Sequence, residues 1–139
     1  MRNKEVLTTS TMADHGGDEM GFDFEKLDVY QKAVNFADDI YNTTSNFPKV
    51  ELFGTVSQLR RAALSVSLNI AEGTGRYHAK ERRLFYRNAK ASVHECVPIL
   101  NISLRQKYIT EFEQKQLYTK CVELARMISG LINSLPTPD

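Results

Sequence analysis

Residues 58–76, with the sequence QLRRAALSVSLNIAEGTGR, indicate the kind of fold that the chain adopts. One apolar row repeats at helical spacing and consists of Val56, Leu59, Ala63, Val66 and Ile70. A second apolar row lies roughly 130° away on the same helix and consists of Leu64, Leu68 and Ala71. A helix with two apolar rows needs more than one packing partner, so this stretch predicts a bundle helix rather than a simple surface helix.

The rest of the chain supplies three more segments with helical periodicity. We expect helices at residues 28–45, 51–72, 79–106 and 111–134, with Gly73 ending the second helix as a C′ residue of positive φ. No alternating strand pattern is present in the sequence. Because short connections favour antiparallel neighbours, the predicted fold is all-α, an antiparallel up-down-up-down four-helix bundle.

Length and composition fit one domain with two tails. Residues 1–21 are polar and aperiodic and predict a flexible N-terminal tail, residues 22–135 form the bundle, and residues 136–139 form a C-terminal tail. No apolar run is long enough for a membrane span, and the N-terminus lacks the apolar core of a secretion signal. We therefore expect a cytoplasmic protein without membrane contact.

Charge is distributed unevenly along the chain. Residues 1–59 hold five Lys/Arg and ten Asp/Glu, whereas residues 60–139 hold thirteen Lys/Arg and seven Asp/Glu. Within the third predicted helix, basic side chains at spacings of three and four share one face, and they are Lys80, Arg83, Arg87, Lys90 and His94. Arg82 flanks this row and Arg76 precedes it.

Three interpretations of this basic row stay open. A row of like charges disfavours an isolated helix, which favours a polyanion partner such as RNA or DNA contacted by Arg76, Lys80, Arg82, Arg83, Arg87 and Lys90. Tyr77 and Tyr86 lie nearby and could stack on unpaired bases, although the spacing of Tyr86 favours a place in the core. The row is equally well explained as a solvated helix face, or as the complement of the acidic first helix of a neighbouring subunit.

The second helix also carries a polar stripe, which consists of Arg61, Ser65, Asn69, Glu72 and Arg76. Glu72 and Arg76 are four residues apart in the orientation that favours an ion pair. Asn69 is a candidate polar residue that fixes helix register or oligomeric state. These spacings favour a role in packing and assembly over a functional contact.

Catalytic chemistry has little support in the sequence. No Glu-x-x-His repeat is present, and the Gly73-Thr74-Gly75 turn lacks the length and the lysine of a phosphate loop. Cys96 and Cys121 fall on apolar faces and have no metal-ligand spacing, which favours inert core thiols in a reducing compartment. We therefore expect a protein that is not an enzyme and holds no metal or cofactor.

The chain resembles the small bacterial four-helix-bundle proteins encoded in intervening sequences of large-subunit ribosomal RNA genes. The opening motifs of that family are similar to FEKLDVYQKA at 24–33, FP at 47–48 and ELFG at 51–54. Its central signature is similar to QLRRAA at 58–63 and NIAEG at 69–73, and includes Arg61, Asn69, Glu72 and Gly73. The resemblance covers about residues 22–135, nearly all of the expected bundle.

This resemblance implies a bundle that assembles as a ring-like homopentamer without catalytic residues. It also links the chain to the accessory variability determinant of diversity-generating retroelements, a similar bundle that binds nucleic acid and partners a reverse transcriptase. We therefore expect a homo-oligomeric, non-enzymatic accessory protein that binds nucleic acid through its basic helix face. The alternative is a protein–protein scaffold, for example one that docks a reverse transcriptase without touching nucleic acid.

Overall fold

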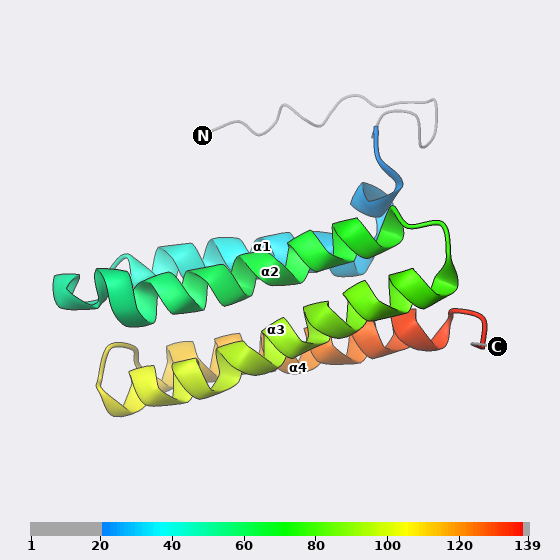
Figure 1. Ribbon diagram of the computed structural model, residues 1–139. Helices are drawn as coiled ribbons and strands as arrows, with labels where there is room; N and C mark the ends of the chain where they lie inside the picture. Colours follow the sequence, from blue (N-terminus) through cyan, green and yellow to red (C-terminus); the bar gives the residue numbers. More distant parts are fainter. Residues whose placement is uncertain (1–20, 138–139) are drawn as a thin grey trace, which may run out of the picture.

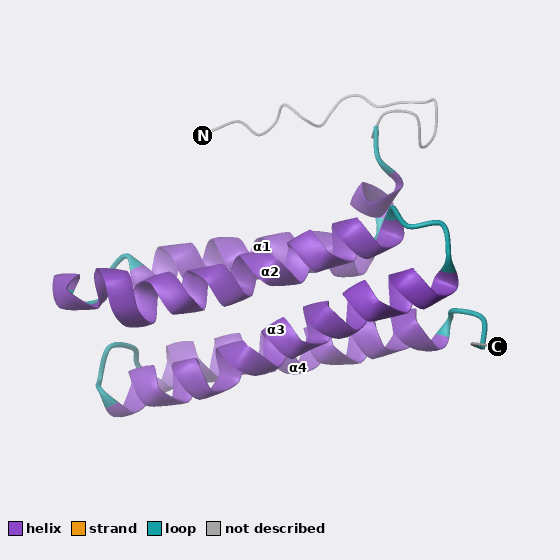
Figure 2. Ribbon diagram, in the orientation of Figure 1, coloured by secondary structure: helices purple, strands orange, loops and turns teal. Residues whose placement is uncertain are grey.

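A computed structural model describes residues 21–137, and every regular element within them is helical (Figure 1, Figure 2). The four long helices are α1 (Asp28–Thr44), α2 (Ser57–Thr74), α3 (Ala79–Arg105) and α4 (Glu111–Asn133). Consecutive helices run in opposite directions and are joined by short segments, which confirms the predicted four-helix bundle. The predicted flexible tail lies outside the described residues, except for Gly21.

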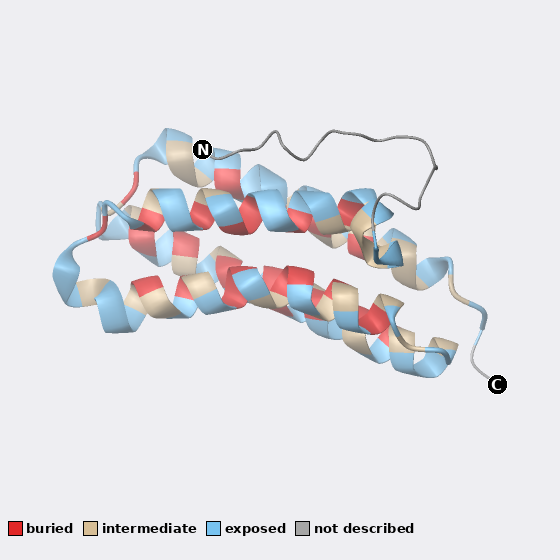
Figure 3. Ribbon diagram, turned by 90° about the horizontal axis from the view of Figure 1, so that it is seen from above, coloured by how far each residue is buried: buried red, intermediate tan, exposed pale blue. Residues whose placement is uncertain are grey.

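The core is formed by the apolar rows that face the bundle axis (Figure 3). The first row of α2 is buried as predicted and meets large side chains of the other helices, among them Phe36, Ile40, Tyr86, Leu100, Leu124 and Ile128. Each such side chain contributes roughly 1.5–3 kcal/mol by leaving water, so these rows supply much of the driving force for folding. None of the helices within residues 21–137 combines the length and apolar composition of a membrane span.

The second apolar row of α2 stays on the outside of the bundle. The side chains of Leu64 and Leu68 are 39% and 61% exposed. The other helices within residues 21–137 therefore leave Leu64 and Leu68 exposed.

The second helix begins later than predicted. Residues 49–56 form two short elements instead, η4 (Lys49–Glu51) and the wider turn η5 (Leu52–Val56). Gly54 takes a non-helical conformation there, with φ −113° and ψ −107°. The Glu51 carboxylate accepts hydrogen bonds from the Thr55 N–H and hydroxyl at 3.2 and 2.7 Å, which stabilises the kinked segment before α2.

Gly73 does not end the second helix, so the predicted role of this glycine is wrong. The helix continues through Thr74, and Gly75 is its capping residue, with a φ of −78°. A Cβ atom on Gly73 would lie 2.8 Å from Cε1 of Tyr86 and 3.0 Å from Cβ of Phe85. Glycine is needed here because α3 approaches the α2 backbone too closely for any side chain.

The α1–α4 seam is bridged by ion pairs at the bundle surface. Lys120 of α4 pairs with Asp39 of α1, and Nζ of Lys32 lies 3.5 Å from Oε2 of Glu123. Each helix contributes one basic and one acidic side chain to these two ion pairs. The acidic residue Asp39 is thus paired within the chain.

Candidate nucleic-acid interface

The turn between α2 and α3 is fixed by Arg82. Its Nε donates to the carbonyl of Arg76 at 2.7 Å, and its terminal NH2 group donates to the carbonyl of Thr74 at 3.2 Å. The Thr74 carbonyl belongs to the last turn of α2, where backbone acceptors lack partners within the helix, and Arg76 lies two residues beyond it. Arg82, which we predicted to contact nucleic acid, therefore has a structural role in this turn.

Arg83 is the predicted site residue that the structure removes from the basic row. Its side chain is only 8% exposed, and its terminal NH2 group donates to the carbonyl of Pro136 at 2.6 Å. The residue lies toward α4 and the C-terminal segment rather than on the outer face of α3. Its guanidinium holds residues after α4 in place, so it is not available to a phosphate.

Arg76 is held in place at the edge of the same turn. Its guanidinium donates to Oε1 of Glu72 at 2.8 Å, which confirms the predicted ion pair, and lies 4.6 Å from the centre of the Phe85 ring. The side chain remains partly exposed, whereas its Nε is buried without a hydrogen-bond partner among the described residues. Arg76 therefore has restricted freedom to turn toward a ligand.

The basic row that faces solvent consists of Lys80, Arg87, Lys90 and His94, and we call it the α3 basic face. Lys80, Arg87 and His94 are exposed and Lys90 is half-buried. Within residues 21–137 none of these four side chains forms an ion pair or a hydrogen bond through its side chain. Structure and sequence therefore agree that α3 carries a row of positive charge without ion-pair partners among the described residues, but the row is narrower than predicted.

Tyr77 is the most exposed aromatic residue of the α2–α3 turn. Its side chain is 90% exposed, and its ring meets that of His78 edge to face with 5.0 Å between centroids. Tyr86, by contrast, is buried and shares a hydrogen bond of 2.8 Å with the hydroxyl of Thr74. The structure thus separates a core tyrosine from one that points into solvent at the start of α3.

The signature residues on α2 lie beside α3 or on the outer surface. The side-chain amide of Asn69 donates to the carbonyl and hydroxyl of Ser65 at 2.8 and 2.9 Å. The Ser92 hydroxyl of α3 lies 2.8 Å from the same Ser65 hydroxyl. This chain of polar contacts fixes the α2–α3 register within one molecule, whereas Arg61 is exposed.

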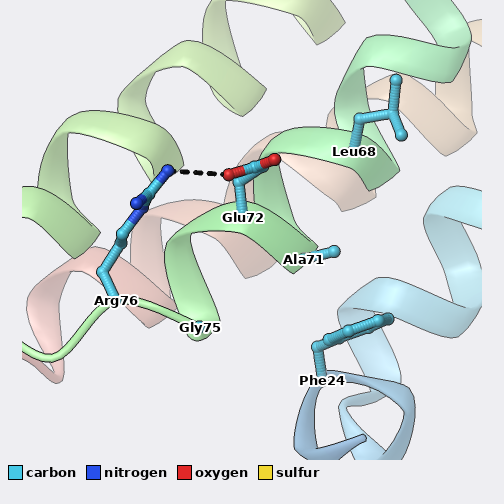
Figure 4. Close-up of a pocket in the computed structure, with 6 residues that line it drawn as sticks. All are labelled: Phe24, Leu68, Ala71, Glu72, Gly75 and Arg76. Atoms are coloured by element: carbon cyan, nitrogen blue, oxygen red, sulfur yellow. Dashed lines mark hydrogen bonds and ion pairs between the residues drawn. The ribbon is translucent and has the colours of Figure 1, made fainter.

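A pocket of about 360 Å³ lies where the N-terminal segment meets the end of α2 (Figure 4). Phe24, from the short helix η3 (Asp23–Lys26), lies across from Ala71 and Gly75. The Glu72–Arg76 ion pair forms another side of the pocket, and Leu68 completes its lining. The pocket therefore joins part of the exposed α2 row to the α2–α3 turn.

The metal-binding side chains of residues 21–137 are dispersed, and the two thiols are buried. Within residues 21–137 no group of three or more His, Cys, Asp or Glu side chains is placed to hold a metal ion. Cys96 and Cys121 are both buried, and burial raises the pKa of the Cys121 thiol to about 12 and that of Cys96 even further. Both thiols are consequently protonated and poorly nucleophilic at neutral pH.

One exposed apolar feature was missed by the sequence analysis. Val50 and Phe53 project from η4 and η5 at the opposite end of the bundle from Tyr77, and Phe53 is 92% exposed. Between them, Glu51 accepts a hydrogen bond of 2.9 Å from the Tyr108 hydroxyl, which ties this tip to the α3–α4 loop. The apolar residues of VELF at 50–53 could have indicated this feature. Because we expected a helix from residue 51, the sequence did not show which of these side chains would face solvent.

Comparisons with known proteins match one protein family over nearly all of the bundle. The family model described as 23S rRNA-intervening sequence protein matches residues 25–130. A crystal structure from Bacteroides thetaiotaomicron, of a protein in the S23 ribosomal protein family, has a similar fold with a TM-score of 0.69. The two chains are 21% identical, and the match covers 76% of this chain and 99% of the other. No curated protein sequence matches the chain.

Proposed function

Because the chain belongs to the 23S rRNA-intervening sequence protein family, we propose that it is a non-enzymatic accessory protein that binds nucleic acid through the α3 basic face. The observation that supports this proposal is the presence of three cations, Lys80, Arg87 and Lys90, without an acidic partner among the described residues. A solvated row of like charges weakens its own helix slightly, whereas a phosphate backbone would neutralise it.

The spacing of this face suits a phosphate backbone. Seven residues separate Lys80 from Arg87, which corresponds to about 10 Å along the helix axis. One strand of a nucleic-acid helix presents a phosphate about every 3.4 Å, so this distance covers roughly three phosphates. Contacts of this type give affinity without reading the base sequence.

Charge reversal tests the proposal. We expect the double variant Lys80→Glu, Arg87→Glu to lose at least tenfold in affinity for a fluorescent oligonucleotide, measured by anisotropy at low salt. The matched control is Lys115→Glu, Arg126→Glu, which makes the same change of net charge at exposed positions on α4. Arg83 is unsuitable for this test because it is buried. Absence of binding to both RNA and DNA, or equal loss in both double variants, would overturn the proposal.

We further propose that the exposed row of α2 is covered by a second copy of the chain, as the family resemblance to a ring-like pentamer implies. Leu64 and Leu68 are apolar and exposed, and the small residues Ala71 and Gly75 continue the same line. We expect the mass in light scattering to exceed that of a monomer at micromolar concentration. Leu68→Glu should reduce this mass without loss of helical circular dichroism, and a monomeric wild-type protein would contradict the assembly.

A protein-docking scaffold is the second candidate, and the exposed apolar tip favours it. Val50 and Phe53 present large apolar side chains to solvent at one end of the bundle. Such exposed apolar groups are typical of protein–protein contact sites. If a reverse transcriptase encoded beside the gene is the partner, the purified proteins should co-elute, and Phe53→Ser should abolish the complex while leaving nucleic-acid affinity unchanged.

A further inference from the structure

We infer that the α3 basic face takes single-stranded nucleic acid, and that the ring of Tyr77 is the platform on which an unpaired base stacks. This inference rests on the proposed function and specifies its ligand. The observation that carries it is an aromatic ring, 90% exposed, at the start of the helix that bears unpaired cations.

The Tyr77 ring has no evident role in the fold. It contributes nothing to the buried core, and its hydroxyl makes no hydrogen bond within residues 21–137. The other aromatic residues near this turn are engaged inside the chain, because Phe85 lies under the Arg76 guanidinium and Tyr86 is buried. The Tyr77 ring is therefore free of packing contacts with the core and is accessible to a ligand.

The backbone that carries Tyr77 is held in place. Arg82 donates hydrogen bonds to the carbonyls of Arg76 and Thr74, which lie one and three residues before Tyr77. The rings of Tyr77 and His78 pack edge to face, with 5.0 Å between their centroids. A base that stacks here would meet a ring on an ordered turn, so binding would cost less conformational entropy than it would on a mobile loop.

The charged side chains after Tyr77 favour binding of a nucleic-acid strand along one side of α3. Lys80 lies three residues after Tyr77 in the chain, in the first turn of α3, and Arg87 lies on the same face of that helix. Glu81 is exposed about 100° round the helix from Lys80, so its carboxylate disfavours phosphates on that flank. A strand that follows the cations therefore ends beside Tyr77 rather than beside Glu81.

A stacking contact of this kind selects unpaired bases. The faces of bases in a duplex are already covered by their neighbours, so a surface ring reaches them only after unstacking. The bases of a single strand are free to stack on an aromatic side chain without regard to sequence. The combination of a cationic track and one exposed ring thus favours a single strand over a duplex of the same length.

The absence of tryptophan from the sequence makes a site-specific test possible. In a Tyr77→Trp variant all indole emission comes from this position, and we expect a 12-nucleotide single strand to quench it. An abasic strand of the same length carries the same phosphates and should bind without quenching. The matched control is Phe53→Trp, an equally exposed position at the opposite end of the bundle, whose emission should not change.

Affinity measurements complete the test. We expect Tyr77→Ala to weaken single-strand binding about 5- to 150-fold, the range for loss of one base–aromatic stack, and to leave duplex binding unchanged. Tyr77→Phe should retain affinity within twofold because the ring is preserved. Single-strand binding without quenching in Tyr77→Trp, or unchanged by Tyr77→Ala, would overturn the inference and leave the proposed function standing. Absence of all nucleic-acid binding at low salt would overturn the proposed function itself.

Discussion

Replacement of Gly73 by alanine should destabilise the bundle, although alanine is the better helix former. The new Cβ would lie 2.8 Å from Cε1 of Tyr86 and 3.0 Å from Cβ of Phe85. The Phe85 atom is next to the backbone and cannot rotate away. Tyr86 is buried and hydrogen-bonded to Thr74, so its ring has little room to move.

The size of the effect follows from two opposing contributions. Overpacking at a tight helix contact costs about 1–3 kcal/mol. The change from glycine to alanine within a helix contributes about 0.5–1 kcal/mol in the opposite direction. The difference between these two contributions spans about 0–2.5 kcal/mol, and its centre is a net loss of about 1.3 kcal/mol in the free energy of unfolding. With a urea dependence of about 2 kcal/mol per M, the unfolding midpoint should fall by about 0.6 M.

Urea unfolding followed by circular dichroism at a fixed protein concentration measures this shift. Gly130→Ala is the matched control, because Gly130 also lies within a long helix and a Cβ there meets no atom within 4 Å. This control should be as stable as the wild type or up to about 1 kcal/mol more stable. If Gly73→Ala behaves like Gly130→Ala, close approach of α3 is not the reason for glycine at this position.

Three further predictions concern the buried arginine, an acidic hydrogen-bond centre and the thiols. Arg83→Met should lower the free energy of unfolding by about 1–2 kcal/mol, because the hydrogen bond to the Pro136 carbonyl is lost. A drop in nucleic-acid affinity as large as that of Lys80→Glu, Arg87→Glu would contradict its structural role. The side-chain and backbone hydrogen bonds of Thr55, and that of Tyr108, lower the pKa of Glu51, so its contribution to stability is present at neutral pH and lost as pH falls below about 4.5. Thermal unfolding should show a deficit for Glu51→Gln at pH 7 that shrinks at pH 3, and a constant deficit would refute the linkage. Cys96 and Cys121 should react with a thiol reagent only when the protein unfolds, and rapid labelling of the native protein would contradict their burial.

The positions of the helices were predictable because the apolar residues at helical spacing are the ones that the fold buries in its core. The first apolar row of α2 is buried as its spacing indicates, and the predicted ends of α1, α3 and α4 lie within a residue of those observed. The start of α2 was not predictable from periodicity, because apolar residues at 50–56 fit a helix until Gly54 leaves helical geometry. Composition alone could not show that the Glu51 carboxylate would stabilise this kink.

The candidate site was predictable only as far as one helix face. Spacing placed Lys80, Arg83 and Arg87 together, but it did not show which edge of that face lies against α4 and the C-terminal segment. Arg83 lies at that edge and is buried. The reason for Gly73 was equally hidden, because sequence shows a glycine near a helix end but not the neighbouring backbone that requires it.

The even number of antiparallel helices has a consequence for anything attached to this protein. Both ends of the described chain lie at the end of the bundle that carries the α2–α3 turn, whereas Val50 and Phe53 lie at the other end (Figure 1). A domain fused directly before Gly21 or after Thr137 would therefore be tethered at the same end of the bundle as the α2–α3 turn, where a short linker gives a high effective concentration. The same tether would leave the opposite tip unobstructed, so two different macromolecules could be carried at once, one at each end of the bundle.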